Sequence, residues 1–201
     1  MGELLIPKII HRIWVGNKQI PEEFVAYEQT WKKYHPDWEM KLWTEENMIP
    51  LQNQMDYDAA KELAKKADIA RYEILYQFGG VYIDCDVECL KNIEHLLEGI
   101  EAFAGAEDDY YITNAVMGCT VNNEIMKYII ENIPASIQKN NTLEINYQTG
   151  PIFITELLKE VSKFTVFEKD VFYPYHWTEK YRKGEKFGKA YAVHHWAASW
   201  T

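Results

Sequence analysis

One eight-residue segment, Gly79-Gly80-Val81-Tyr82-Ile83-Asp84-Cys85-Asp86, constrains the fold more than any other part of this chain. Its two glycines give the backbone freedom to end a helix and turn at once into a strand, predicted over residues 81–87. Side chains alternate along a strand, so Asp84 and Asp86 would project from one face together with Tyr82, roughly 6–7 Å apart. Two hard oxygen ligands in this arrangement suit a divalent cation that keeps positions open for phosphate oxygens.

The residues before the two glycines predict an amphipathic helix from about Asp58 to Phe78. Its apolar positions recur at steps of three and four: Leu63, Ala67, Ala70, Ile74 and Phe78. Asp68 and Arg71 lie three residues apart near the middle of this helix, on a face adjoining the apolar stripe. Spacing alone is explained equally well by a solvated ion pair within the helix.

The remaining pattern predicts alternating strands and helices along a single domain that covers residues 1–201. The further predicted strands span residues 8–15, 39–43, 103–106, 113–119, 164–167 and 190–194, and the further helices span 22–34, a segment capped by Asn123, and one from Pro151 through Val161. This alternation indicates an α/β fold with a mainly parallel central sheet and helices on both faces. In such sheets ligands bind beyond the carboxyl ends of the strands, where Trp14 and the two aspartates would lie.

The composition disfavours nucleic-acid-binding, membrane-spanning and disulfide-stabilised classes of protein. The formal net charge of −10 disfavours nonspecific nucleic-acid binding. No apolar run approaches the roughly 18–20 residues that a membrane span needs, and no signal-peptide core opens the chain. The three cysteines are odd in number and lack zinc-ligand spacing, which indicates a cytoplasmic protein without a disulfide framework.

A basic stretch near the C-terminus is the local exception to the acidic balance. It contains Lys180, Arg182, Lys183, Lys186 and Lys189. One interpretation is peripheral contact with phosphates at the inner face of the plasma membrane, and the other is a solvated loop.

Three segments resemble the family 32 glycosyltransferases, a group that includes bacterial capsule and lipopolysaccharide enzymes and outer-chain mannosyltransferases. The central segment is Ala67-Asp68-Ile69-Ala70-Arg71-Tyr72 leading into the Gly79–Asp86 motif; Ile6–Trp14 resembles the family's opening strand, and His194–Trp200 its closing motif. The catalytic core of the large clostridial glucosylating toxins is similar. The resemblance implies a nucleotide-diphospho-sugar transferase (GT-A) fold and spans residues 6–200.

The resemblance also implies roles for residues of the central segment. Asp86 would bind Mn²⁺ or Mg²⁺ directly, while Asp84 would contact the ribose and sugar of the donor. Asp68 and Arg71 would hold the donor sugar, with Arg71 close to the diphosphate. Tyr82 would frame the nucleotide, and Asn114 would lie beside the donor sugar with Asp84, Asp86 and Arg71 in the catalytic set. Trp14 would stack on the base, with core packing as the alternative.

The closing motif would complete the site. Of the two adjacent histidines, His195 is expected at the metal because the sequence after it resembles related enzymes, and His194 is expected in the core. Ser199 and Trp200 match family positions that contact the diphosphate. A structural role for the histidine pair is the alternative.

The resemblance, together with the paired aspartates, implies a metal-dependent glycosyltransferase, of the retaining type by the family mechanism, that moves a hexose from a UDP- or GDP-sugar to a saccharide or lipid-linked saccharide acceptor. The expected setting is bacterial capsule, lipopolysaccharide or exopolysaccharide synthesis. Two alternatives stay open: a nucleotide-sugar-binding protein without transferase activity, and an Asp-x-Asp phosphatase. The phosphatase class usually has Thr or Val two residues beyond the second aspartate, where this chain has Glu88.

Overall fold

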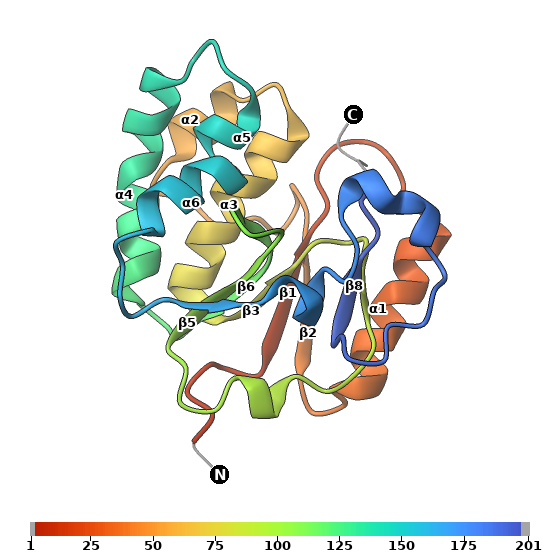
Figure 1. Ribbon diagram of the computed structural model, residues 1–201. Coiled ribbons are helices and arrows are strands. Elements are labelled where there is room, and N and C mark those ends of the chain that lie inside the picture. Colours follow the sequence, from red (N-terminus) through yellow and green to blue (C-terminus); the bar gives the residue numbers. More distant parts are fainter. Residues whose placement is uncertain (1–2, 198–201) are drawn as a thin grey trace.

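The computed structural model describes residues 3–197, and its centre is a six-stranded sheet of order β2-β1-β3-β6-β5-β7 (Figure 1). The strands are β1 (Ile9–Ile13), β2 (Glu39–Trp43), β3 (Gly80–Ile83), β5 (Ala102–Ala106), β6 (Ile112–Cys119) and β7 (Thr165–Phe167). β1 runs parallel to β2 and β3, and β5 runs parallel to β7; β6 lies antiparallel to both β3 and β5. Within the described residues β6 is thus the one strand of this sheet that runs against the others, and the predicted mainly parallel sheet is confirmed.

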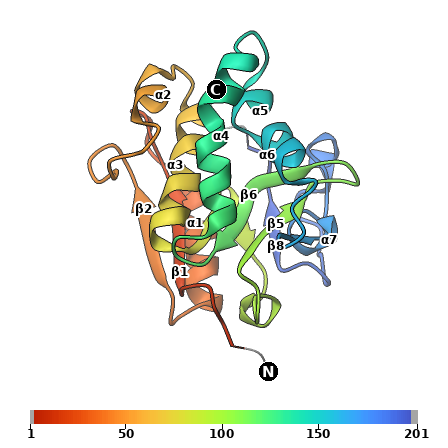
Figure 2. The same cartoon turned by 90° about the vertical axis from the view of Figure 1, so that its left-hand side faces the viewer.

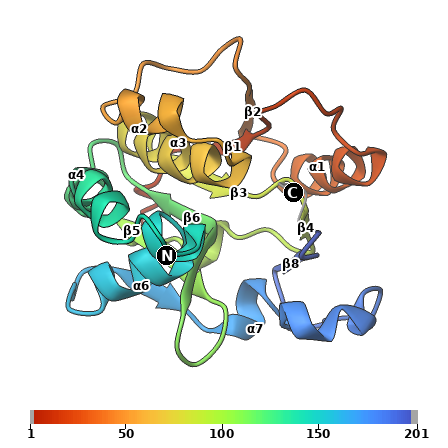
Figure 3. The ribbon, with the colours of Figure 1, turned by 90° about the horizontal axis from the view of Figure 1, so that it is seen from above.

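Side chains that alternate along the strands belong to two separate hydrophobic cores, one on each face of the sheet. Tyr82, Ala104 and Met117 point to one face, where α3 (Leu63–Phe78), α4 (Glu124–Lys139) and α6 (Pro151–Leu158) cover them. Val81 and Phe103 point to the other face, which α1 (Glu22–Tyr34) and α7 (Lys169–Phe172) cover. Figures 2 and 3 show the helices on the two sides of the sheet, as predicted.

A second, two-stranded sheet lies beside α1 and carries the C-terminal part of the described chain (Figure 1). It pairs β4 (Val87–Cys89) with β8 (Ala192–His194) in antiparallel register. Because β4 follows the motif directly, this small sheet brings residues more than a hundred positions later in the chain next to Asp84 and Asp86.

Local signals placed several helix ends correctly. The Asn123 side chain accepts hydrogen bonds from the backbone N–H groups of Ile125 (3.0 Å) and Met126 (3.3 Å), which caps α4. Pro151 opens α6 as predicted. Several short helices were not predicted: α2 (Gln54–Ala59), η1 (Glu94–Leu96), α5 (Ile145–Gln148), α7 and η2 (Trp177–Arg182).

Several predicted elements were too long: the helix predicted through Val161 ends at Leu158, and two larger differences lie nearer the motif. The helix predicted from Asp58 is divided, because the backbone of Ala60 and of Glu62 is extended between α2 and α3. The strand predicted through residue 87 ends at Ile83, and Asp84 to Asp86 form a turn that a hydrogen bond from the Val87 N–H to the Asp84 carbonyl closes at 3.1 Å. The chain leaves the main sheet at this turn to enter the small one. Strand alternation therefore does not explain why the two carboxylates meet.

Two further findings concern the cysteines and the helices. Cys85, Cys89 and Cys119 are all buried and free, consistent with the expected absence of disulfides. Among the described residues, no helix combines the length and the apolar composition required for a membrane crossing.

Candidate functional site

The two glycines before the motif fix its position at the end of β3. Both have positive φ angles, +62° at Gly79 and +89° at Gly80, which L side chains rarely adopt. A Cβ at Gly80 would lie 2.5 Å from the carbonyl oxygen of Ile9 in the neighbouring strand. Glycine therefore lets β3 approach β1 closely enough to pair, and the aspartates follow at the strand end.

Asp84 is held by two side chains from the main-sheet side. The Tyr82 hydroxyl donates to Asp84 Oδ1 at 2.8 Å, and Arg71 Nη1 lies 3.2 Å from the same oxygen. The Arg71 guanidinium also lies over the Tyr82 ring, 4.4 Å from its centroid. These contacts fix the orientation of the Asp84 carboxylate before any ligand binds.

Asp68 belongs to the same buried network. Its Oδ1 accepts from Asn114 Nδ2 at 2.8 Å and lies 3.2 Å from Arg71 Nη2, while its Oδ2 accepts from the Thr149 hydroxyl at 2.9 Å. Burial raises the pKa of Asp68, and the Arg71 charge with the two hydrogen bonds acts in the opposite direction. Asp68 and Arg71 are both buried, so the interpretation as a solvated helical ion pair is wrong.

The other side of the site is formed by Asp86 and His194. His194 Nε2 lies 3.1 Å from Asp86 Oδ1 and 3.8 Å from Asp84 Oδ2. Burial would lower the pKa of His194, but the carboxylates of Asp86 and Asp84 outweigh it and raise that pKa. One potential ligand atom from each of Asp84, Asp86 and His194 lies within 4.8 Å of the others, a spacing at which one cation could contact all three.

This ligand set fits the expected Mn²⁺ or Mg²⁺. Carboxylate oxygens suit both ions, and an imidazole nitrogen adds a ligand that transition metals accept. His194 Nδ1 is buried without a hydrogen-bond partner among residues 3–197, so the described chain holds the ring through Nε2 and through ring packing.

The expected positions of the two histidines are reversed. His195, not His194, lies away from the aspartates: its Nε2 is 3.0 Å from Glu88 Oε2, its Nδ1 is 3.1 Å from the Tyr175 hydroxyl, and its ring stacks on Tyr27 at 4.5 Å. The register of the small sheet is the physical reason. His194 pairs with Val87, so it lies next to the turn, whereas the following residue faces the opposite side.

The segment after β8 closes over the aspartates. Trp196 has a positive φ of 52°, unusual for a bulky residue, and its ring lies 4.1 Å from that of His194. This conformation brings the Ala197 N–H within 2.8 Å of Asp86 Oδ2. The closing motif contains Trp196, but no role was predicted for this residue, because its contact depends on the positive φ.

Side chains from both sides of the site line one hollow of about 380 Å³, the Asp84 pocket. Asp86 and Tyr82 are not part of its lining. Of the predicted residues, it is lined by Asp68, Arg71, Asp84 and Asn114; of the unpredicted ones, by Glu107, Thr113, Asn146, Trp177, His194 and Trp196. Glu107 follows β5, and burial raises its pKa, partly offset by His176. A charged residue just beyond a strand end was the sequence signal that could have indicated it.

Trp14, a predicted donor contact, does not line this pocket. Trp14 is 7% exposed and packs beside Phe24 and Cys85, next to the motif turn, so stacking on a base stays a prediction. Ser199 and Trp200 lie outside the described residues. In the basic stretch, Arg182 is paired with Glu179 and Glu185, and Lys183 with Glu23, so part of its charge is neutralised.

Comparison with known sequences gives one family and a set of relatives. Residues 21–103 match the glycosyltransferase sugar-binding region containing the DXD motif. Inositol phosphoceramide mannosyltransferase 3 of Schizosaccharomyces pombe is 34% identical over 158 residues, 75% of this chain and 44% of that protein. An uncharacterized glycosyltransferase of Acanthamoeba polyphaga mimivirus is 30% identical over 171 residues, 79% of this chain and 67% of that protein. The chain spans about half the length of the fungal relatives.

Solved structures agree on the fold. The PaToxG glycosyltransferase superposes with a TM-score of 0.67 at 20% identity, over 78% of this chain and 70% of that one. The galactosyltransferase LgtC, in complex with donor and acceptor sugar analogs, superposes with a TM-score of 0.55 at 12% identity, over 92% of this chain and 86% of that one. The fold is therefore of the GT-A type, and the chain belongs to the family of glycosyltransferases whose sugar-binding region contains the DXD motif.

Proposed function

We propose that this protein is a metal-dependent, retaining glycosyltransferase that moves a hexose from a UDP- or GDP-sugar to a saccharide acceptor. The observation that carries the proposal is one pocket that joins two kinds of group. Asp84 and His194 line the pocket and would hold a cation together with Asp86, while Arg71, Asp68 and Asn114 form a buried polar wall beside them.

The proposed reaction breaks the bond between the sugar C1 and the donor diphosphate and forms a bond from C1 to an acceptor hydroxyl oxygen on the same face. The hydroxyl proton passes to the departing diphosphate. Mn²⁺ or Mg²⁺ held by Asp84, Asp86 and His194 would neutralise the charge that develops on the diphosphate. Arg71 keeps Asp84 and Asp68 in fixed positions, because it bridges both carboxylates at 3.2 Å. Asp68 and Asn114 would orient sugar hydroxyls.

The names of the relatives indicate candidates for the transferred sugar and for the acceptor. Several relatives are named mannosyltransferases, and those of fission yeast are named for inositol phosphoceramide. Mannose is therefore the first candidate sugar, and a glycolipid is a candidate acceptor. The expected setting in bacterial surface-polysaccharide synthesis, a cytoplasmic location and membrane contact through Lys180–Lys189 stay predictions.

The test is calorimetric titration of the protein with UDP-glucose, UDP-galactose and GDP-mannose, each with Mn²⁺ and with EDTA. We expect one donor to bind with Mn²⁺ and to lose at least about tenfold in affinity with EDTA, which corresponds to about 1.4 kcal/mol. Equal affinity in both conditions would remove the metal from the proposal.

A nucleotide-sugar sensor would bind the donor as tightly but leave it intact. Slow donor hydrolysis without an acceptor separates the two functions, because transferases commonly pass the sugar to water. Hydrolysis that Asp86→Asn abolishes supports the transferase; binding with no hydrolysis and no transfer to any acceptor supports the sensor.

A further inference from the structure

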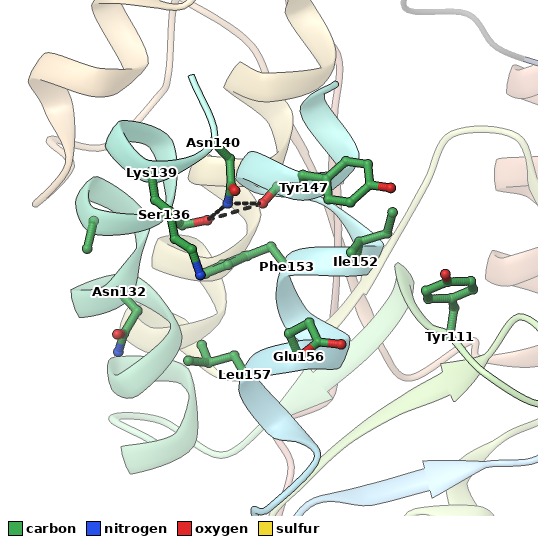
Figure 4. A pocket seen from close by; sticks show the side chains of 11 residues that line it. Tyr111, Asn132, Ser136, Lys139, Asn140, Tyr147, Ile152, Phe153, Glu156 and Leu157 are labelled. Carbon is green, nitrogen blue, oxygen red and sulfur yellow. Dashed lines mark hydrogen bonds between the residues drawn. The ribbon is translucent and has the colours of Figure 1, made fainter. Parts of the chain in front are cut away.

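We propose that a second hollow, the α4–α6 groove, is a saccharide-binding subsite for the part of an acceptor chain beyond the reacting sugar. The groove has a volume of about 640 Å³ and is walled by α4, α5, α6 and the β5–β6 connection (Figure 4). This inference rests on the proposed transferase function, since it names the acceptor class that the same enzyme would take.

The groove combines aromatic faces with polar side chains. Tyr111 and Tyr147 are 41% and 40% exposed on one side of it. Lys139 and Asn132 line the α4 side, and Glu156, which pairs with Lys159 at 2.9 Å, lines the α6 side. Sugars present apolar C–H faces that pack on aromatic rings and hydroxyls that bind amides and cations. The lining therefore suits a saccharide better than a purely apolar ligand.

Hydrogen bonds hold the groove in shape. The carbonyl oxygen of Tyr147 accepts from Ser136 Oγ at 3.2 Å and from Asn140 Nδ2 at 3.0 Å, so the end of α5 is tied to α4 (Figure 4). These bonds use backbone and α4 side-chain atoms and leave the Tyr147 ring exposed. A pre-formed wall of this kind lowers the entropic cost of binding.

The groove and the Asp84 pocket share one wall. Asn146 and Pro151 line the pocket, while their chain neighbours Tyr147 and Ile152 line the groove. Thr149, between them, donates its hydroxyl to Asp68 inside the pocket network. The two hollows therefore lie on either side of the segment 145–152, and an acceptor chain that passes from the pocket over this segment would reach the groove; for this reason we take the extension of the acceptor as its occupant.

The experiment is a solution NMR titration of the whole chain with α-linked mannotriose, cellotriose and mannose as probes. We expect a trisaccharide to shift the backbone amide resonances of Tyr147 and Ile152, and mannose alone to bind more weakly. A variant carrying Tyr111→Ala and Tyr147→Ala should weaken trisaccharide binding by about tenfold, the loss of about 1.4 kcal/mol. Lys139→Ala should weaken it to a smaller extent, and it retains both aromatic rings.

The matched control is Tyr181→Ala, because Tyr181 is 81% exposed on η2 and lines neither hollow. Equal loss of binding in this control, or no shift of groove resonances with either trisaccharide, would overturn the proposal. Nucleotide-sugar binding with Mn²⁺ is measured on the same samples. Saccharide binding without donor binding would overturn the transferase function, and with it the acceptor role of the groove, although the groove would still bind saccharide; donor binding without saccharide binding would overturn the groove alone.

Discussion

The two sides of the Asp84 pocket hold their functional groups in different ways. On the main-sheet side, Arg71 bridges Asp68 and Asp84, and partners from three separate segments complete the network. On the small-sheet side, His194 meets Asp86 through one nitrogen and otherwise rests on the Trp196 ring. A fully partnered network fixes geometry, whereas a group with one polar contact can exchange that contact for a metal. We therefore expect the first side to orient Asp84, and the second side, through Asp86 and His194, to adjust when a cation binds.

The largest expected effect is at the turn that joins the two sides. Asp86→Asn should lower transfer at least about a hundredfold, because an amide cannot supply the anionic ligand. Asp84→Asn should do the same. Circular dichroism should show an intact fold for both, since Asn keeps the volume. Glu88→Gln, two residues on and paired with His195 instead, is the control that should retain turnover. Near wild-type turnover in either aspartate variant would contradict the assignment.

Arg71→Lys tests the main-sheet side alone. A lysine ammonium keeps the charge but cannot bridge Asp68 and Asp84 while also donating to the Asn114 carbonyl, as Arg71 Nη1 does at 2.7 Å. We expect transfer to fall severely and the free energy of unfolding to drop by about 1.5–3 kcal/mol. Denaturant unfolding and donor turnover measure both. Unchanged values would show that the bridge does not position Asp84.

His11 contacts the glycine turn, and its titration is expected to make the folding stability of the protein sensitive to acid. His11 Nε2 lies 2.9 Å from the Gly79 carbonyl, and Trp43 Nε1 donates to His11 Nδ1 at 3.1 Å, so the ring is neutral. Burial lowers the pKa of His11 from 6.5 to about 4. The folded-state pKa of His11 lies below the unfolded value. The contribution of the neutral ring to the free energy of unfolding is therefore complete above pH 6.5 and is lost as the pH falls toward 4.

We expect the stability difference between wild type and His11→Gln to shrink by about 2–3 kcal/mol between pH 7.5 and pH 4.5. Urea unfolding at the two pH values measures it, and the variant subtracts the titration of other groups. A difference that stays constant with pH would show that His11 is not buried in its neutral form.

Substitutions of the two adjacent histidines are expected to have the smallest effects, and they test the small-sheet side of the pocket. His194→Ala should weaken Mn²⁺-dependent donor binding about tenfold. His195→Ala should instead lower the free energy of unfolding by about 1–3 kcal/mol, because it removes the contacts to Glu88 and Tyr175. Calorimetry and thermal melts separate the two effects. The reverse pattern would restore His195 as the metal ligand.

The sequence alone determined the main sheet, both helix layers and one half of the pocket. The helix predicted over residues 22–34 and the strand predicted over 39–43 match α1 and β2, and cap signals at Asn123 and Pro151 placed two helix starts. Spacing alone left Asp68 and Arg71 equally explained as a solvated ion pair, and the family resemblance placed them beside Asp84, where the structure has them. Resemblance then added Asn114, which the structure bonds to Asp68.

Only the tertiary structure decided the other half. His194 and His195 are neighbours with identical side chains, and the pairing of β8 with β4 selects which one reaches the aspartates. That register depends on contacts across more than a hundred residues, which no local pattern encodes. The same holds for Trp196, whose positive φ places it over His194. Local periodicity fixes which face a side chain takes within its own strand, but the partner strand decides what that face meets.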